Sequence, residues 1–260
     1  MTLLSNPLNW WMIFNSRMAT LFISDLHLQP QKPAVVQAFL QFVQTQTQGI
    51  DALYILGDLF EAWIGDDFDN DFSDAIKTAL SSVTARDIPV FLIHGNRDFL
   101  IGERFAAQTG CEILPDPTLI DLYGFPTLLM HGDTLCTDDT AYLEFRRMVR
   151  NPNWQNELLG KSIPDRLAIA QNLRDVSKEK TGGKTAEIMD VTQSEVERVM
   201  AEHHVRRLIH GHTHRPQVHQ LNIAKTPAER IVLGDWDKYG WVLKVDQTTY
   251  QLEQFKIAEG

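Results

Sequence analysis

The sequence of 260 residues has few cysteines, no long apolar run and fewer basic than acidic residues. Its two cysteines, Cys111 and Cys136, are too few for the disulfide framework of a small secreted domain, so we expect both to be reduced packing residues. No stretch reaches the roughly 18 consecutive apolar residues that a transmembrane helix needs. Lys and Arg number 24 against 34 Asp and Glu, a net charge of −10, which argues against a general nucleic-acid binder. These absences favour a reduced, cytosolic globular protein with a full hydrophobic core.

Residues 1–17 differ from the rest of the chain. They lack the basic start, the long apolar run and the small-residue cleavage site of a signal peptide. An apolar strand follows directly after Met18, so we predict that Met18 is the natural start, that 1–17 is an N-terminal extension, and that 18–260 forms one domain. The alternative is an amphipathic membrane contact built on Trp10, Trp11 and Phe14.

From Met18 onward, short apolar strands alternate with helical stretches, the pattern of an α/β domain. The predicted strands are 21–24, 52–56, 90–93, 127–130, 207–210 and 230–233, and the clearest helices are 32–46, 72–86 and 192–203. The strands are almost continuously hydrophobic, which indicates a sheet covered on both faces. In open sheets of this class, the ligand site lies at the carboxyl ends of the strands.

Residues 141–185 break this alternation, because they read as helices without clear strands. Pro164 fits the first turn of a helix whose packed face would carry Leu167, Ala170, Leu173 and Val176. The window holds nine basic and five acidic residues, a net charge of +4 in an acidic protein. We predict a helical insert that covers an anionic substrate; the alternative is a solvated helical hairpin.

Short polar segments follow the predicted strands, and together they predict a metal centre. They are Asp25-Leu26-His27, Gly57-Asp58, Gly95-Asn96-Arg97-Asp98, His131-Gly132-Asp133 and Gly211-His212-Thr213-His214. Strand alternation would put Asp25 and His27 on one side of the chain. Imidazole, carboxylate and amide oxygen without thiolate suit Mn²⁺ or a related ion better than structural zinc. Each segment alone is weak evidence for a metal site, since the two side chains of an Asp-x-His segment often only form a hydrogen bond with each other. His210, inside an apolar strand, is interpreted as a core histidine or as one that supports the ligands, and not as a ligand itself.

The order of these segments resembles the calcineurin-like metallophosphoesterase superfamily. The resemblance implies an α/β sandwich of two mixed β-sheets flanked by helices, here with the helical insert. It also implies two metal ions, which would clamp the attacking and leaving oxygens of a phosphoryl transfer. By this resemblance, one ion would be held by Asp25, His27, Asp58 and His214, and the other by Asp58, Asn96, His131 and His212.

Four longer motifs narrow the resemblance to one family. Residues Tyr54–Asp67, His94–Phe99, His131–Asp139 and Ile209–Pro216 look like the UDP-2,3-diacylglucosamine diphosphatases of lipid A biosynthesis. That family implies hydrolysis of the diphosphate to 2,3-diacylglucosamine 1-phosphate (lipid X) and UMP, with two Mn²⁺ per chain and water attack on the α-phosphorus. It further implies peripheral contact with the cytoplasmic face of the inner membrane of a Gram-negative bacterium. No nucleic acid and no obligate protein partner are expected.

Arg97 departs from the superfamily pattern in an informative way. Many members carry a histidine there that helps to protonate an alkoxide leaving group. A phosphate can leave as an anion, because its second pKa is about 6, and it needs charge neutralisation rather than a proton. A guanidinium supplies that charge permanently, so Arg97 favours diphosphate cleavage. Alternatively, Arg97 simply pairs with Asp98 or Asp133.

The resemblance also implies roles for individual residues. Asn96, Arg97, His131 and His212 would be catalytic, and further substrate contacts would come from Asp139, Arg174, Ser177, Thr181 and Lys184. The family often has Asn at the position of Thr181. Candidates for an acyl-binding surface are Trp63, Phe99, Tyr142, Phe145, Met148 and Trp154, although aromatics at helical spacing are usually core. The competing hypotheses are another dinuclear phosphoesterase, such as a nucleotide diphosphatase, cyclic-nucleotide phosphodiesterase or protein phosphatase, and a metal-free scaffold.

Overall fold

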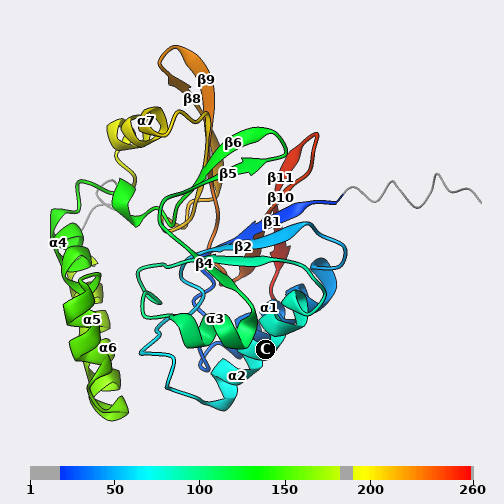
Figure 1. The fold of residues 1–260 in the computed structure, drawn as a ribbon. Helices are drawn as coiled ribbons and strands as arrows, with labels where there is room; N and C mark the ends of the chain where they lie inside the picture. Colours follow the sequence, from blue (N-terminus) through cyan, green and yellow to red (C-terminus); the bar gives the residue numbers. More distant parts are fainter. Residues whose placement is uncertain (1–17, 182–189, 259–260) are drawn as a thin grey trace, which may run out of the picture.

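Two mixed β-sheets pack face to face and carry helices on their outer faces (Figure 1). The computed structural model describes residues 18–181 and 190–258, and for 176–181 it describes the backbone alone. The predicted α/β sandwich of two mixed sheets with flanking helices is therefore confirmed. The predictions for 1–17 lie outside the described residues.

The first sheet has six strands, of which four run parallel. Its order is β11 (Tyr250–Lys256), β10 (Tyr239–Val245), β1 (Thr20–Ile23), β2 (Ala52–Leu56), β3 (Val90–Ile93) and β4 (Glu112–Leu114). The strands β10 and β11 add antiparallel neighbours beside β1. The parallel strands β1, β2 and β3 therefore end at one edge, where the polar segments begin.

The second sheet has five strands. Its order is β5 (Thr118–Leu122), β6 (Phe125–Leu129), β7 (Arg207–His210), β9 (Thr226–Val232) and β8 (Gln217–Ile223). The central strands β6, β7 and β9 are parallel, and β5 and β8 pair antiparallel at the edges. Two more polar segments follow β6 and β7.

The core forms three layers of side chains. Between the sheets, Phe22, Leu56 and Ile93 pack with Ile209 and Ile231. The helices α1 (Pro33–Gln46), α2 (Asp71–Thr84) and α3 (Glu103–Thr109) cover the first sheet, and α7 (Gln193–Glu202) covers the second. Because both faces of each sheet are buried, the central strands are nearly continuous hydrophobic runs.

The helical insert contains α4 (Thr140–Val149), α5 (Pro152–Leu159) and α6 (Ile163–Thr181), gathered at one side of the sandwich (Figure 1). A short 3₁₀ helix, η2 (Asp133–Leu135), precedes them. The predicted packed face of α6 is wrong at Leu167, whose side chain is 43% exposed. Arg166, one residue earlier, is buried instead, because its Nη1 donates to Ile64 O, in the connection between β2 and α2.

The predicted strands 52–56, 90–93 and 207–210 have the bounds of β2, β3 and β7. The helices α1, α2 and α7 begin and end within two residues of the predicted bounds. The strands β4, β5, β8, β10 and β11 were not predicted. Most lie at or next to sheet edges and are partly exposed, so their residues alternate instead of forming continuous apolar runs.

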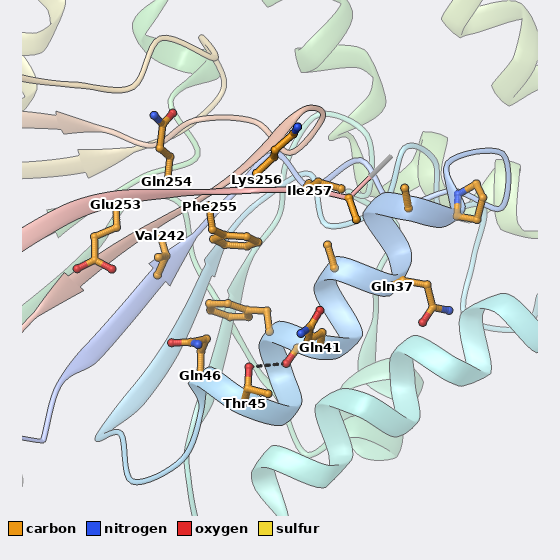
Figure 2. A pocket seen from close by; sticks show the side chains of 15 residues that line it. Gln37, Gln41, Thr45, Gln46, Val242, Glu253, Gln254, Phe255, Lys256 and Ile257 are labelled. Carbon is orange, nitrogen blue, oxygen red and sulfur yellow. Dashed lines mark hydrogen bonds between the residues drawn. The ribbon is translucent and has the colours of Figure 1, made fainter. Parts of the chain in front are cut away.

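A groove of about 580 Å³ runs between α1 and β11, away from the polar segments (Figure 2). Gln37 and Gln41 of α1 face it from one side, and Phe255 from the other. Among the described residues, no helix combines the length and apolarity that crossing a bilayer requires.

Candidate metal centre

The loops that follow β1, β2, β3, β6 and β7 bring the predicted ligands together. Paired main chains join the first two loops, because Asp25 N donates to Gly57 O at 3.0 Å and His27 N donates to Asp58 O at 3.0 Å. We predicted that strand alternation would put Asp25 and His27 on one side of the chain. That reason is wrong, because β1 ends at Ile23, before either residue. Left-handed backbone, with φ of 54° at Asp25 and 48° at His27, turns both side chains inward instead.

The same conformation recurs at Asp58, His212 and His214, with φ of 52°, 68° and 56°. Left-handed backbone at a residue other than glycine costs on the order of 1–3 kcal/mol, and it clusters at functional sites. Its recurrence at these candidate ligands indicates that the fold holds the loops in a geometry that local sequence does not favour.

One group of ligand atoms comes from Asp25, His27 and His214, which lie within 4.8 Å of one another. The two histidines point Nε2 at Nε2 across 3.3 Å, and His214 Nε2 lies 3.4 Å from Asp25 Oδ1. A second group contains Asp25, Asp58 and His131. Asp25 thus belongs to both groups, whereas the family resemblance gives the bridging position to Asp58.

Asn96 and His212 complete the second group. Asn96 Oδ1 lies 3.0 Å from His131 Nε2 and 3.0 Å from His212 Nδ1. Asp58 Oδ2 faces both halves of the site, at 3.7 Å from His27 Nε2 and 3.9 Å from His131 Nε2. The structure therefore brings all seven predicted ligands together, and their assignment to individual ions stays a prediction.

Neighbouring groups orient these ligands. His131 Nδ1 lies 2.9 Å from Leu56 O, a contact that favours a proton on Nδ1 and leaves Nε2 free to bind an ion. The main-chain N–H of Arg97 donates to Asp58 Oδ1 at 2.8 Å, so Oδ2 is the oxygen turned into the site. Glu61 Oε2 lies 3.0 Å from His27 Nδ1, on the side of the ring away from the other ligands. Sequence reasoning missed Glu61, because no spacing rule links it to His27.

The loops leave no room for larger residues at two glycines. A Cβ at Gly95 would lie 2.0 Å from Asp58 Oδ1 and 2.2 Å from Asp58 N. A Cβ at Gly211 would lie 2.2 Å from Asp25 Oδ2. Real Cβ atoms do not approach so closely, so glycine allows these loops to pack directly against two candidate ligands.

The electrostatics of the site favour a cation. Burial lowers the pKa of His131, but the carboxylates of Asp58 and Asp133 outweigh it and raise the pKa to about 9. Burial also raises the pKa of Asp25, but His214 and the other histidines hold that pKa well below its usual range. Burial, with a further contribution from His131, lowers the pKa of His212 to about 4, so this imidazole is neutral at pH 7. The carboxylates that favour a proton on His131 would equally favour a divalent ion in its place, and the neutral imidazole of His212 can bind one.

A buried carboxylate oxygen without a hydrogen bond also favours a bound cation. Asp25 Oδ1 is buried and makes no well-aligned hydrogen bond with the described residues. An unpaired buried carboxylate oxygen is costly unless a cation or hydrogen bond compensates it. The donor set and this oxygen together fit a bound divalent metal.

The comparisons with known proteins agree with this geometry. A family model described as calcineurin-like phosphoesterase matches residues 18–216. The chain belongs to the calcineurin-like phosphoesterase family. The predicted hydrolase class is thereby confirmed, and a divalent metal site is implied by the family.

Several relatives that match this phosphoesterase over their full length are named UDP-2,3-diacylglucosamine hydrolase. One from Xanthomonas oryzae pv. oryzae is 50% identical over 247 residues, with 92% of this chain and 100% of the relative covered. Relatives from Azotobacter vinelandii and Pseudomonas aeruginosa are 52% and 50% identical over 240 residues, with the same coverage. The predicted membership of that family is confirmed.

An apolar pocket opens beside the metal centre of the phosphoesterase. The candidate ligand Asn96 lines it together with Arg97 and Tyr142. Of the residues predicted for an acyl-binding surface, Trp63, Phe99, Tyr142, Phe145 and Trp154 line this pocket. Met148 is not among the lining residues, and its side chain is 44% exposed.

The remaining predicted contacts are spread around this pocket. Arg97 and Arg174 line it, and Arg174 Nη2 donates to Gln171 Oε1 at 2.6 Å. Asp139 caps α4, where its Oδ1 accepts the N–H of Tyr142 at 3.1 Å. The side chains of Ser177 and Thr181, and the whole of Lys184, lie outside the described residues.

The carboxylates suggested as alternative partners of Arg97 are engaged elsewhere. Asp98 accepts main-chain N–H groups from Leu59 and Gly95 at 2.7 and 2.8 Å. Asp133 accepts from Arg146 and Tyr142. Arg97 Nε is buried without a hydrogen bond to the described residues, which leaves this nitrogen available to a ligand.

Two further predictions concern buried groups. His210 is fully buried, and burial, with a contribution from Arg230, lowers its pKa to about 3, as expected of a core histidine. Cys111 and Cys136 are buried and form no disulfide within the described part of the chain, which confirms their interpretation as reduced packing residues.

Proposed function

We propose that this protein hydrolyses the diphosphate of UDP-2,3-diacylglucosamine, giving 2,3-diacylglucosamine 1-phosphate (lipid X) and UMP, with Mn²⁺. The observation that carries the proposal is the direct junction of the candidate metal centre with an aromatic pocket at Asn96, Arg97 and Tyr142. A substrate with a diphosphate next to acyl chains matches that junction. The names of the relatives support the same substrate.

The proposed cofactor is a pair of Mn²⁺ ions held by Asp25, His27, Asp58, Asn96, His131, His212 and His214. When bound, two such ions lower the pKa of water and stabilise the attacking and leaving oxygens. Asp58 is proposed as the shared ligand, because its Oδ2 faces both His27 and His131.

The chain's own groups stabilise the charge of the diphosphate. Arg97 places a permanent positive charge in the lining of the pocket, with its Nε unpaired among the described residues. Water attacks the α-phosphorus, and the sugar 1-phosphate leaves as an anion that needs no proton. Asn96 and His212 hold the attacked phosphoryl group in place, and Asp139, Arg174, Ser177, Thr181 and Lys184 are proposed as further substrate contacts.

The helical insert, residues 141–185, is proposed to cover the acyl chains. The pocket between the insert and the core has a volume of only about 90 Å³. Small-molecule sites usually measure about 300–1,000 Å³, so we propose that α5 and α6 move away from the core when acyl chains bind. Trp154 of α5 and Leu173 of α6 would then contact the chains.

Hydrolysis in H₂¹⁸O with Mn²⁺ tests substrate and mechanism together. Label in UMP, measured by mass spectrometry, is the expected result. Label in lipid X would keep the substrate and refute attack at the α-phosphorus. No turnover, with activity on simple nucleotide diphosphates or monoesters, would refute the substrate and leave only the family.

Replacing Asp58 and His131 by Ala tests the metal centre against a metal-free scaffold. We expect hydrolysis to fall by several orders of magnitude, because each change removes a ligand from a buried site. Complementation of a strain that lacks the activity provides the second measurement. Full complementation by the double variant would favour the scaffold.

We also propose peripheral contact of the insert with the cytoplasmic face of the inner membrane. The insert is basic in an acidic protein, and it exposes Met148, Leu159 and Leu167. Basic residues near anionic lipid contribute about 1 kcal/mol each. Sedimentation with vesicles rich in phosphatidylglycerol should fall when Arg147 and Lys161 are changed to Glu. Unchanged sedimentation would refute this surface.

A further inference from the structure

The helix α4 is tied to the metal loop by one buried carboxylate. Asp133 is fully buried and lies two residues after the candidate ligand His131. Its Oδ2 accepts from Tyr142 Oη at 2.5 Å and from Arg146 Nε at 2.7 Å. Tyr142 and Arg146 are one helical turn apart, so both donors to this carboxylate lie on a single face of α4.

Tyr142 stands where the metal centre meets the apolar pocket. Its ring centroid lies 5.9 Å from that of His212, and its side chain lines the pocket together with Asn96 and Arg97. The side chain has few alternative positions while its hydroxyl donates to a buried, charged acceptor. Without that acceptor, the ring could turn about χ1 and away from His212.

Arg146 also holds the carboxylate in place, through a second bond to the same oxygen. Besides its bond to Asp133, its Nη2 lies 3.6 Å from Asp116 Oδ2, in the connection between β4 and β5. The guanidinium therefore supplies the positive charge that a buried carboxylate requires. The tyrosine contributes orientation, and the arginine contributes charge balance.

We propose that Asp133 is a positioning residue, which fixes Tyr142 and with it α4 over the metal-facing His212. This role rests on the proposed function only for its effect on turnover. The link between Asp133 and α4 is independent of the substrate, and it can be measured without one.

The test compares Asp133→Asn and Tyr142→Phe, singly and together, with Tyr123→Phe as the control. Tyr123 and Asp51 form a similar pair away from the metal centre, because the Tyr123 hydroxyl donates to Asp51 Oδ2 at 2.5 Å. Tyr142→Phe keeps the ring and removes only the hydroxyl, so it remains informative if Asp133→Asn fails to fold.

Amide hydrogen exchange of residues 140–149 is the first readout. Loss of a bond to a charged acceptor should speed exchange about ten-fold or more in both site variants and leave it unchanged in Tyr123→Phe. Equal exchange in wild type and Tyr142→Phe would overturn the proposal, whatever the enzyme hydrolyses.

Turnover is the second readout. If Asp133 acts through Tyr142, the double variant should lose no more kcat/KM than the more damaging single variant. Multiplicative losses would mean that Asp133 acts through another route, and they would overturn the positioning role. If wild type does not hydrolyse UDP-2,3-diacylglucosamine, the proposed function fails, and the exchange measurement still decides the role of Asp133.

Discussion

Replacing Asp98 should destabilise the protein more than replacing an ordinary surface carboxylate would. Asp98 is fully buried and joins two ligand-bearing loops. It accepts the N–H of Leu59 at 2.7 Å and of Gly95 at 2.8 Å, with a longer contact of 3.4 Å to Phe60 N. Asp98→Ala would leave these buried donors without an acceptor.

The magnitude follows from the two short bonds. Hydrogen bonds to a charged group contribute about 1.5–3 kcal/mol each, so Asp98→Ala should cost about 3–6 kcal/mol of unfolding free energy. At roughly 2–4 °C per kcal/mol for a chain of this size, Tm should fall by about 6 °C or more. Asp98→Asn should lie between, because its amide NH₂ would face one of the donors.

Asp121→Ala is the matched control. Asp121 also accepts a main-chain N–H, from Gly124 at 2.6 Å, but it is an exposed residue near the end of β5. There water can replace the lost acceptor, so we expect a cost of about 1 kcal/mol or less. Thermal and urea unfolding measure both variants. Equal losses in Asp98→Ala and Asp121→Ala would refute the reasoning from burial.

Three further predictions follow from buried groups. Burial, with a contribution from Asp133, raises the pKa of Asp116 from 3.8 to about 6. Its ionised form therefore destabilises the fold increasingly as pH rises from 3.8 through 6. Asp116→Asn should stabilise the protein by about 3 kcal/mol at pH 8 and by almost nothing near pH 4 in urea unfolding; an equal gain at both would contradict this. Mn²⁺ at 100 times its Kd should add about 2.7 kcal/mol to the unfolding free energy, and this gain should vanish in Asp58→Ala; calorimetry checks both. Burial raises the pKa of Cys111 to about 11 and of Cys136 to about 12, so neither thiol should react with a disulfide reagent at pH 8 until the protein is unfolded.

Features that depend on neighbouring residues could be predicted from the order of the amino acids. The strands β2 and β3 are runs of mostly buried apolar residues, and their bounds follow from where each apolar run begins and ends. The ligand segments follow strands that end at one edge, so their chemistry predicted a metal centre. The inference of diphosphate chemistry from Arg97 stays a prediction.

Only the tertiary structure decided how these segments meet. Left-handed backbone at Asp25 and His27 replaces the expected strand alternation, because the loops after β1 and β2 pair with each other through their main chains. The pairing of Glu61 with His27, and of Tyr142 with Asp133, joins elements whose spacing follows no helical or strand period. Such contacts depend on where the folded sheets carry each loop, and a linear sequence holds that information only through the whole fold.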